Sequence, residues 1–425
     1  MIKFWSSLVL LLLSIVAQSQ DMRLIKKSIY TLAGPGFGGR GYVANGRDKA
    51  ARFLHRTFSE MGLKSFYDSG NFYQQYYFSV NTFPSKVELK MGKKHMEPGV
   101  DFIVDAASVG FRTAEKSKME TINLSKIKDS IQWQKLKTSF KSDKVYQLKH
   151  FDTLCKRMNS SHRLMVQQLP AACYLIPQSN KLIWTVATEN IPATVFYVAD
   201  SSLAKGKKVE VQVQHKFLKK TPSNNVIGYI PGTQVPDSFF VFTAHYDHLG
   251  KMGNQAIFPG ANDNASGTAF MLALIKYFKE NPPKYSIAFI AFSGEEAGLL
   301  GSSHYVAHPA FPLSSIKFLV NIDLMGDASD GLTVVNAVEQ KDAFELLQKI
   351  NTAKNYLPKI NSRSNAANSD HYPFTQANVP AIFIYAMGGK GHYHDVFDQP
   401  KELSLDKIPE VFRLLSDFIT QKSHQ

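Results

Sequence analysis

Short apolar runs alternate with amphipathic stretches from Asp237 to the end of the chain. Four apolar runs have the length of strands, at residues 238–244, 285–292, 316–324 and 379–386. Three amphipathic stretches have the length of helices, at residues 267–280, 340–354 and 404–421. This alternation predicts an α/β fold in three layers, with a mainly parallel central sheet and helices on both of its faces.

The first half of the chain has a different pattern. Residues 47–61 place apolar side chains at helical spacing, which predicts an amphipathic helix that packs on the later α/β domain. The middle holds β-rich pieces, such as residues 181–186 and 209–217, among polar stretches. We therefore predict an N-terminal helical segment at 20–75, an inserted β-rich domain at 76–220 and the α/β domain at 221–425.

The first twenty residues read MIKFWSSLVLLLLSIVAQSQ. A basic Lys3, an apolar run at 8–16 and the small residues around Ala17 and Ser19 are typical of a secretory signal peptide, which we place at 1–19. The apolar run is too short to span a bilayer, and no later stretch is long enough. We therefore expect a secreted or periplasmic protein with no stable membrane span.

Charge and cysteine content narrow the function classes. The net charge is +14, and residues 76–220 carry 24 Lys and Arg against 12 Asp and Glu. These basic residues are scattered without interleaved aromatic residues, which favours a solvated surface over a nucleic-acid partner, with contact to an anionic envelope as the alternative. Cys155 and Cys173 are the two cysteines, and one disulfide or two buried thiols both remain open. The sequence does not indicate an oligomeric state.

Imidazole and carboxylate side chains follow the predicted strands. Strand 238–244 is followed by His245 and Asp247, and side chains two residues apart share a face of an extended segment. Asp247 can then fix the tautomer of the His245 ring. Asp263 stands in a glycine-flanked turn before helix 267–280, where a capping turn is the plainer interpretation.

Three other strands end in similar groups. Glu295 and Glu296 follow strand 285–292, Asp323 lies in strand 316–324, and His394 follows the last strand. The carboxyl ends of parallel strands are where open α/β sheets place their sites. Adjacent carboxylates at the edge of a core need a group that neutralises them, or one of them acts as an acid, because desolvation strengthens their repulsion. Two imidazoles and several carboxylates suit a pair of divalent metals such as Zn²⁺.

The chain resembles the M28 metallopeptidases, a family of dizinc aminopeptidases, over residues 225–415. The motifs that carry the resemblance are His245-Tyr-Asp247-His-Leu-Gly250, Asp263-Asn-Ala-Ser-Gly267, Ser293-Gly-Glu295-Glu296-Ala-Gly298, Asn321-Ile-Asp323-Leu-Met325 and Tyr393-His394. Gly39-Arg40-Gly41 resembles the N-terminal segment of the family. The resemblance implies that the domain at 221–425 is a zinc peptidase and that the insert at 76–220 is a protease-associated-like domain.

The resemblance also implies a site with two zinc ions. His245 and Asp323 would hold one ion, and Glu296 and His394 would hold the other. Asp263 would bridge both ions, commonly with a cis peptide bond after it.

The resemblance further implies catalytic roles. Glu295 would be the general base that takes a proton from the attacking water and later the acid that protonates the leaving amine. Tyr393 resembles a tyrosine that stabilises the oxyanion in some members. The substrates would be peptides with a free N-terminus, with an unknown preference at the scissile position.

Other histidines are not expected to bind the metals, because two imidazoles already complete the set; these are His248, His304, His371 and His392. The stretch Ser369-Asp370-His371 either shapes the substrate pocket or begins a helix.

Two other functions are compatible with the same fold. Glutaminyl cyclases share an Asp-His-x-Pro-Phe element like residues 370–374, but the motifs around Asp263 and Glu295 are closer to the aminopeptidase forms. A binding module without catalysis is the second alternative, although such relatives usually lose a ligand or the base. The GxGxxG pattern at Gly34 to Gly39 follows no strand, which favours a loop over a nucleotide site.

Overall fold

The computed structural model describes residues 22–67, 70–114, 117–203 and 208–424. The predicted signal peptide at 1–19 lies outside these residues. Within the described parts of the chain, no helix is both long and apolar enough to cross a membrane.

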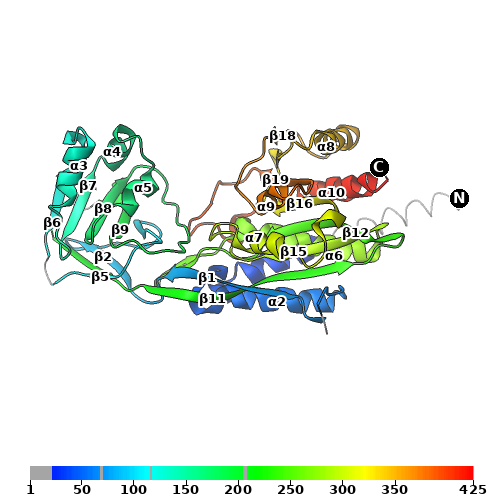
Figure 1. Ribbon diagram of the computed structural model, residues 1–425, viewed down its shortest axis with the longest axis horizontal. Coiled ribbons are helices and arrows are strands. Elements are labelled where there is room, and N and C mark those ends of the chain that lie inside the picture. Colours follow the sequence, from blue (N-terminus) through cyan, green and yellow to red (C-terminus); the bar gives the residue numbers. More distant parts are fainter. Residues whose placement is uncertain (1–21, 68–69, 115–116, 204–207, 425) are drawn as a thin grey trace.

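An eight-stranded mixed sheet forms the centre of the larger half of the molecule (Figure 1). The four middle strands are parallel neighbours, as the sequence pattern predicts. Antiparallel pairs extend the sheet on both sides, β11 against β15 and β17 against β19. In spatial order the strands are β1 (Tyr73–Thr82), β11 (Lys216–Ile230), β15 (Tyr285–Phe292), β12 (Val235–His245), β16 (Ile316–Asp323), β19 (Ala381–Met387), β17 (Gly331–Val335) and β18 (Ile360–Arg363).

Helices cover both faces of this sheet and give the three predicted layers. One face packs against residues 22–32, which are helical, and against α2 (Gly46–Glu60), α6 (Gly267–Glu280), α8 (Lys341–Lys354) and α10 (Ile408–Lys422). The other face packs against α7 (Leu300–Ala307) and α9 (His371–Gln376). Strand β12 serves both layers, because Phe240 and Phe242 face the first and Phe239 and Val241 face the second.

Strands β1 and β11 leave the sheet as an antiparallel pair and lead to the insert (Figure 1). The insert contains an antiparallel sheet of β3 (Lys94–His95), β2 (Val87–Met91), β10 (Val209–Val213) and β5 (Phe111–Arg112). Its second sheet contains β4 (Phe102–Val104), β9 (Thr194–Ala199), β8 (Cys173–Gln178), β7 (Val145–Lys149) and β6 (Met119–Asn123). Its helices are α3 (Ser130–Lys137), α4 (Phe151–Arg157) and α5 (His162–Gln167). The division into domains at 76 and 220 stays a prediction, and both positions lie within the paired strands.

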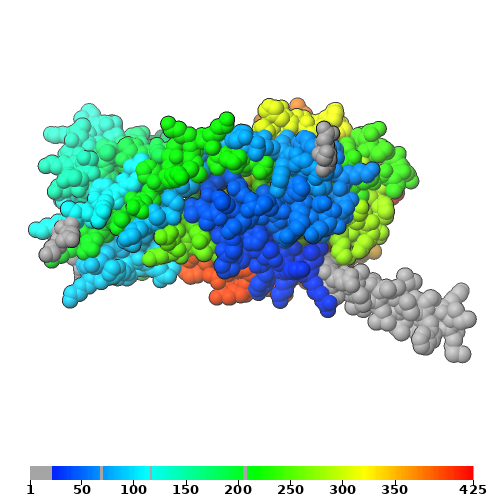
Figure 2. All heavy atoms as spheres, turned by 90° about the horizontal axis from the view of Figure 1, so that it is seen from below, coloured from blue at the N-terminus to red at the C-terminus, as the bar shows by residue number. Residues whose placement is uncertain are grey.

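The core of the insert is completed by a hairpin that comes from the other half of the chain. Strands β13 (Gly250–Met252) and β14 (Ala256–Phe258) pair with each other and bury Met252 and Phe258 in the same cluster as the apolar faces of β2 and β10. Figure 2 shows the N-terminal residues, in blue, on the underside of the larger half, with the insert at the left. The two halves therefore share buried contacts.

Of the two β-rich pieces predicted in the middle segment, one is wrong and one is confirmed. Residues 181–186 have alternating burial but pair with no neighbouring strand in the described chain, because the Trp184 amide donates to the carbonyl of His394. Residues 209–217 are β-rich as predicted, in two strands, since β10 ends at Val213 and β11 begins at Lys216.

Both cysteines are free and buried. Cys173 packs in the cluster between the two insert sheets, and Cys155 packs in the cluster under α4 and α5, on the other side of the second sheet. Of the two possibilities that the sequence leaves open, the structure therefore has two buried thiols.

Candidate metal centre

The carboxyl ends of β12, β15, β16 and β19 meet at one edge of the central sheet and carry the predicted residues. His245 is the last residue of β12, and Asp323 is the last residue of β16. Glu295 and Glu296 follow β15, and His394 follows β19. The fold therefore brings together side chains that are up to 149 positions apart in the sequence.

Two imidazoles face opposite oxygens of one carboxylate. His245 Nε2 lies 3.3 Å from Asp263 Oδ1 and 3.4 Å from Asp323 Oδ2. On the other side, His394 Nε2 lies 3.0 Å from Asp263 Oδ2 and 3.1 Å from Glu296 Oε2. Asp263 is thus shared by two donor groups, each completed by one further carboxylate.

These donor sets fit zinc ions. Donor atoms about 2.0 to 2.2 Å from a zinc ion at tetrahedral corners lie about 3.3 to 3.6 Å apart, close to the spacings around His245. His245, Asp263 and Asp323 offer ligand atoms within 4.8 Å of one another, and so do His245, Glu295 and Glu296. Burial leaves little water to solvate the carboxylates, so a divalent cation would neutralise charge that is otherwise costly to bury.

The ring orientation of both histidines suits a metal at Nε2. His245 Nδ1 lies 3.2 Å from the carbonyl oxygen of Asp247, and His394 Nδ1 lies 3.0 Å from the carbonyl oxygen of Trp184. A carbonyl only accepts hydrogen bonds, so Nδ1 carries the proton and the lone pair of Nε2 is free for a metal.

Attraction between opposite charges sets the ionisation of the cluster. Burial lowers the pKa of His245, but the Glu295 and Asp323 carboxylates outweigh burial and raise that pKa well above its usual value. Burial raises the pKa of Asp263, but hydrogen bonds from His245 and His394 hold it well below its usual range. Asp263 and Glu296 therefore favour the ionised form, which is the form that binds a metal, whereas burial raises the pKa of Asp323.

The turn that carries Asp263 is held from two directions. The backbone amides of Asn262 and Asp263 donate to the two carboxylate oxygens of Asp398, at 2.8 and 3.0 Å. The peptide bond between Asp263 and Asn264 is cis, as the resemblance implies. These contacts fix the direction of the shared carboxylate.

Glu295 lies beside the first donor group. Its Oε2 is 4.0 Å from His245 Nε2, farther than the nearest oxygens of Asp263 and Asp323. Burial, as the largest cause, raises the pKa of Glu295 well above its usual value. A carboxyl group that favours its protonated form is suited to exchange protons with a substrate.

The predicted role of Asp247 needs correction. Its carboxylate oxygen is 3.9 Å from His245 Nδ1, too far for a hydrogen bond, and the backbone carbonyl of Asp247 accepts instead at 3.2 Å. The shared-face argument assumed an extended chain through position 247, but β12 ends at His245. Asp247 Oδ1 accepts from the amide of Glu295 at 3.3 Å, so this carboxylate helps to place the Glu295 turn.

His248 is a residue that the sequence interpretation set aside. It is fully buried, and its Nδ1 lies 2.6 Å from Glu296 Oε1, the oxygen that does not face His394. His248 therefore orients Glu296 and forms a further candidate donor group with Glu296 and Asp263. Its position three residues after His245, at the same strand end, was the available signal.

Tyr393 lies at the mouth of the centre. Its ring stacks on the ring of His394, with centroids 3.9 Å apart and planes at 13°, and it is 43% exposed. The stretch Ser369-Asp370-His371 is instead fully buried at the start of α9. Asn321 donates to Ser369 Oγ at 2.7 Å, and burial raises the pKa of Asp370 to about 7. This stretch therefore begins a helix, which is one of the two possibilities that the sequence leaves open.

Arg40 is a buried residue that positions the loops of the centre. The sequence shows it only as part of the motif Gly39-Arg40-Gly41. Its guanidinium donates to five backbone carbonyls, among them those of Tyr246 at 2.8 Å, Gly260 at 2.7 Å and Asp263 at 3.1 Å. The others belong to Leu32 and Pro259. Gly39 allows this approach, because a Cβ there would lie 2.2 Å from the carbonyl oxygen of Phe258. Arg40 thus ties the N-terminal segment to both ligand loops.

We expect Arg40→Met to lower the free energy of unfolding by about 3 kcal/mol or more, because buried carbonyls lose their donors while the apolar stem remains. Urea unfolding of the metal-free protein measures this. Arg56→Met is the control, since Arg56 is an exposed member of an i,i+4 pair on α2 and should change stability by less than about 1 kcal/mol. Equal effects of the two substitutions would contradict the role of Arg40.

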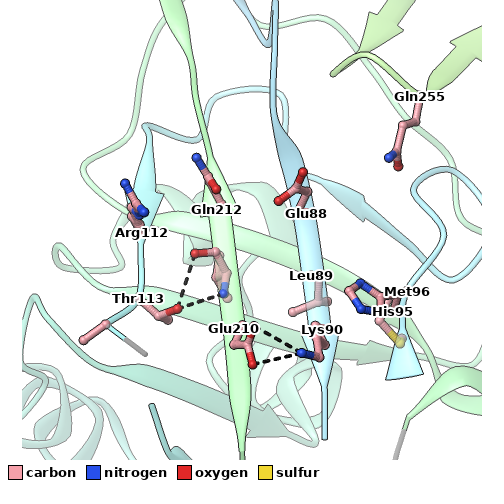
Figure 3. A pocket seen from close by; sticks show the side chains of 12 residues that line it. Glu88, Leu89, Lys90, His95, Met96, Arg112, Thr113, Glu210, Gln212 and Gln255 are labelled. Atoms are coloured by element: carbon pink, nitrogen blue, oxygen red, sulfur yellow. Dashed lines mark hydrogen bonds and ion pairs between the residues drawn. The ribbon is translucent and has the colours of Figure 1, made fainter. Parts of the chain in front are cut away.

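A separate hollow of about 340 Å³ lies over the outer face of the insert. Figure 3 shows Glu88, Lys90, Glu210 and Gln212 projecting from β2 and β10, with Gln255 on the other wall. Lys90 Nζ lies 3.1 Å from Glu210 Oε1, so these two charged groups form an ion pair with each other. None of the metal-centre residues lines this hollow, and the metal centre is therefore the better candidate for chemistry.

Comparison with known proteins points to one family. Residues 225–419 match Peptidase family M28. Aminopeptidase YwaD of Bacillus subtilis (strain 168) is 33% identical over 219 residues, which are 49% of this chain and 46% of that protein. A probable leucine aminopeptidase of Trichophyton verrucosum is 28% identical over 239 residues, 53% of this chain and 62% of that protein. The chain thus spans about half the length of the curated relatives that it matches.

Solved structures share the fold over nearly the whole chain. A zinc aminopeptidase from Bacillus subtilis aligns with a TM-score of 0.63 and 19% identity, over 94% of this chain and 93% of that one. An aminopeptidase from Aneurinibacillus sp. strain AM-1 aligns with a TM-score of 0.62 and 20% identity over the same shares. The fold likeness includes the insert, and the family match covers the metal centre. The part of the chain that carries the metal centre, residues 225–419, is therefore the part that matches Peptidase family M28.

Proposed function

We propose that this protein is a secreted or periplasmic aminopeptidase that uses two zinc ions to hydrolyse the first peptide bond of peptides with a free N-terminus. The observation that carries the proposal is the position of Asp263, whose two carboxylate oxygens face His245 and His394 separately. A carboxylate that bridges two metals has this arrangement, whereas a single-metal site needs only one of its oxygens.

The donor sets divide between two ions. His245 and Asp323 would hold one, Glu296 and His394 would hold the other, and Asp263 would bridge them. When bound, the zinc ions supply Lewis-acid polarisation of the scissile carbonyl and lower the pKa of the attacking water.

Glu295 is the proposed general base. It takes the proton of the attacking water and returns it to the leaving amine, so its carboxyl group must stand beside the metals and keep its oxygens free. The 4.0 Å between Glu295 Oε2 and His245 Nε2 is compatible with this position. Tyr393 is proposed to donate a hydrogen bond from its hydroxyl to the developing oxyanion. Its ring stacks on the imidazole of the proposed ligand His394 and is partly exposed to solvent.

The proposed substrate class, peptides with a free N-terminus, rests on the names of similar proteins and on the residues of the metal centre. The similar Bacillus subtilis protein is named an aminopeptidase, and the Trichophyton verrucosum protein a probable leucine aminopeptidase. The N-terminal composition, with a basic residue before a short apolar run, supports export. N-terminal sequencing of protein recovered from the periplasm or the medium should begin near residue 20, and recovery of an intact leader would contradict export.

A substrate panel tests the activity. We expect cleavage of aminoacyl para-nitroanilides, loss of cleavage with a chelator and recovery with added zinc. N-acetylated versions of the same compounds are the matched controls and should not be cleaved, because an aminopeptidase requires a free amine. Equal cleavage of acetylated compounds would contradict the proposal, and ammonia release from a Gln-initiated peptide without peptide-bond cleavage would indicate a glutaminyl cyclase.

A further inference from the structure

We propose that the insert contributes to the metal centre, because its residues Lys181 and Trp184 position His394 for metal binding. The inference rests on the proposed function, in which His394 is a zinc ligand. Lys181 and Trp184 belong to the extended segment that precedes β9 and pairs with no strand in the described chain.

The backbone of Trp184 holds His394 at two points. The amide of Trp184 donates to the carbonyl of His394 at 3.0 Å, and His394 Nδ1 donates to the carbonyl of Trp184 at 3.0 Å. His394 has a φ of 52°, in the left-handed region, which is unfavourable for a residue with a Cβ. The two hydrogen bonds therefore fix both an unfavourable backbone conformation and the direction of the ring.

Lys181 fixes the loop that follows His394. Its Nζ lies 2.5 Å from Asp395 Oδ2 and 3.0 Å from the carbonyl oxygen of Gly391. Asp395 is buried, and its Oδ1 accepts from the amides of Phe397 and Asp398. His392 Nδ1 is 3.7 Å from the same carboxylate, so Lys181 is the nearer basic side chain.

The same loop reaches the shared carboxylate. Asp398, whose amide is held by Asp395, accepts from the amide of Asp263 at 3.0 Å. A contact made by the insert is thus two hydrogen bonds away from the residue that would bridge both ions.

The segment is itself anchored in the shared core. Trp184 Nε1 donates to the carbonyl of Val104 in β4 at 2.8 Å, and its ring stacks on Phe258 at 4.7 Å. Phe258 belongs to the hairpin that joins the His245 and Asp263 loops, and it is buried with the insert strands. These contacts fix the position of Trp184, and the hydrogen bonds from Trp184 in turn position His394.

Loss of an outer contact of this kind typically weakens metal binding by 10- to 100-fold, because the ligand loses its preset orientation. A contact that only stabilises the fold would lower the melting temperature and leave zinc affinity unchanged. Zinc affinity and the stability of the metal-free protein therefore separate the two roles.

The test uses three variants of the full chain. Lys181→Met removes the ion pair from a partly exposed position, and Lys181→Arg retains the charge. Lys90→Met removes an ion pair with the exposed Glu210, away from the centre. Zinc dissociation constants are measured by competition with a chromophoric chelator, and melting temperatures are measured on the metal-free proteins.

We expect Lys181→Met to weaken the binding of one zinc ion by roughly tenfold or more, with Lys181→Arg and Lys90→Met close to wild type. Hydrogen exchange should also show that zinc slows exchange at residues 181–187 in the wild type and slows it less in Lys181→Met, since coupling between sites is reciprocal. Unchanged zinc affinity in Lys181→Met would overturn this inference alone. A wild-type protein that takes up no zinc would refute the proposed function and this inference with it.

Discussion

Replacement of Glu295 by Gln should abolish turnover and leave the zinc content unchanged. The amide has the size of the carboxylate but does not accept the proton of the attacking water, and a general base typically contributes 10²- to 10⁴-fold to the rate. Glu295 Oε2 lies farther from His245 Nε2 than the two aspartate oxygens do, so its replacement should leave the donor set intact. The turnover number on an aminoacyl para-nitroanilide and the zinc content of the same sample measure the two effects.

Glu345→Gln is the matched control for this substitution. Glu345 is exposed on α8, 3.7 Å from Lys341 in an i,i+4 pair, and its replacement should leave turnover close to wild type. Wild-type turnover in Glu295→Gln would show that another group takes the proton.

Replacement of Glu296 by Ala should remove one zinc ion as well as the activity. Glu296 Oε2 is 3.1 Å from His394 Nε2, and Oε1 is 2.6 Å from His248 Nδ1. The substitution therefore deletes a ligand of the second ion and the partner of a buried imidazole. Elemental analysis after dialysis against trace zinc should find close to one ion per chain in place of two.

The two substitutions are adjacent in sequence, so each serves as the positional control for the other. A Glu296→Ala protein that kept two zinc ions would place Glu296 outside the ligand set, and His248 would then be the better candidate to complete the second group.

The sequence predicts the central fold well because its signals are local. Strand β15 and helix α6 have the bounds predicted from the pattern, 285–292 and 267–280. A strand that is covered on both faces is apolar throughout, and a helix before Pro282 has a clear end. Once the strands are parallel, their carboxyl ends meet, and this alone brings His245 and Asp323 together.

The contacts that orient the ligands could not be predicted in this way. Trp184 and His394 are 210 positions apart, and Arg40 and Asp263 are 223 positions apart. Both contacts use backbone carbonyls, which every residue has, so no residue type in the sequence indicates them. His248 was misjudged for a related reason, since the number of histidines does not reveal which carboxylate each ring faces.

The pair Glu295 and Glu296 shows how neighbours acquire different surroundings. Gly294 has a φ of 70°, and a Cβ there would lie 2.8 Å from Tyr76 Oη, so the chain turns sharply as it leaves β15. After this turn Glu295 lies near His245 and Glu296 faces His394. All the same, both carboxylates have an oxygen within 4.8 Å of a ring nitrogen of His245, so geometry alone allows either to bind the first ion.

Native mass spectrometry of three proteins tests this division most directly. Wild type, Glu295→Gln and Glu296→Ala, each loaded with zinc and dialysed in parallel, should retain two, two and one zinc ions per chain. Loss of a zinc ion from Glu295→Gln, with two ions retained by Glu296→Ala, would contradict the assignment of Glu295 as base and Glu296 as ligand.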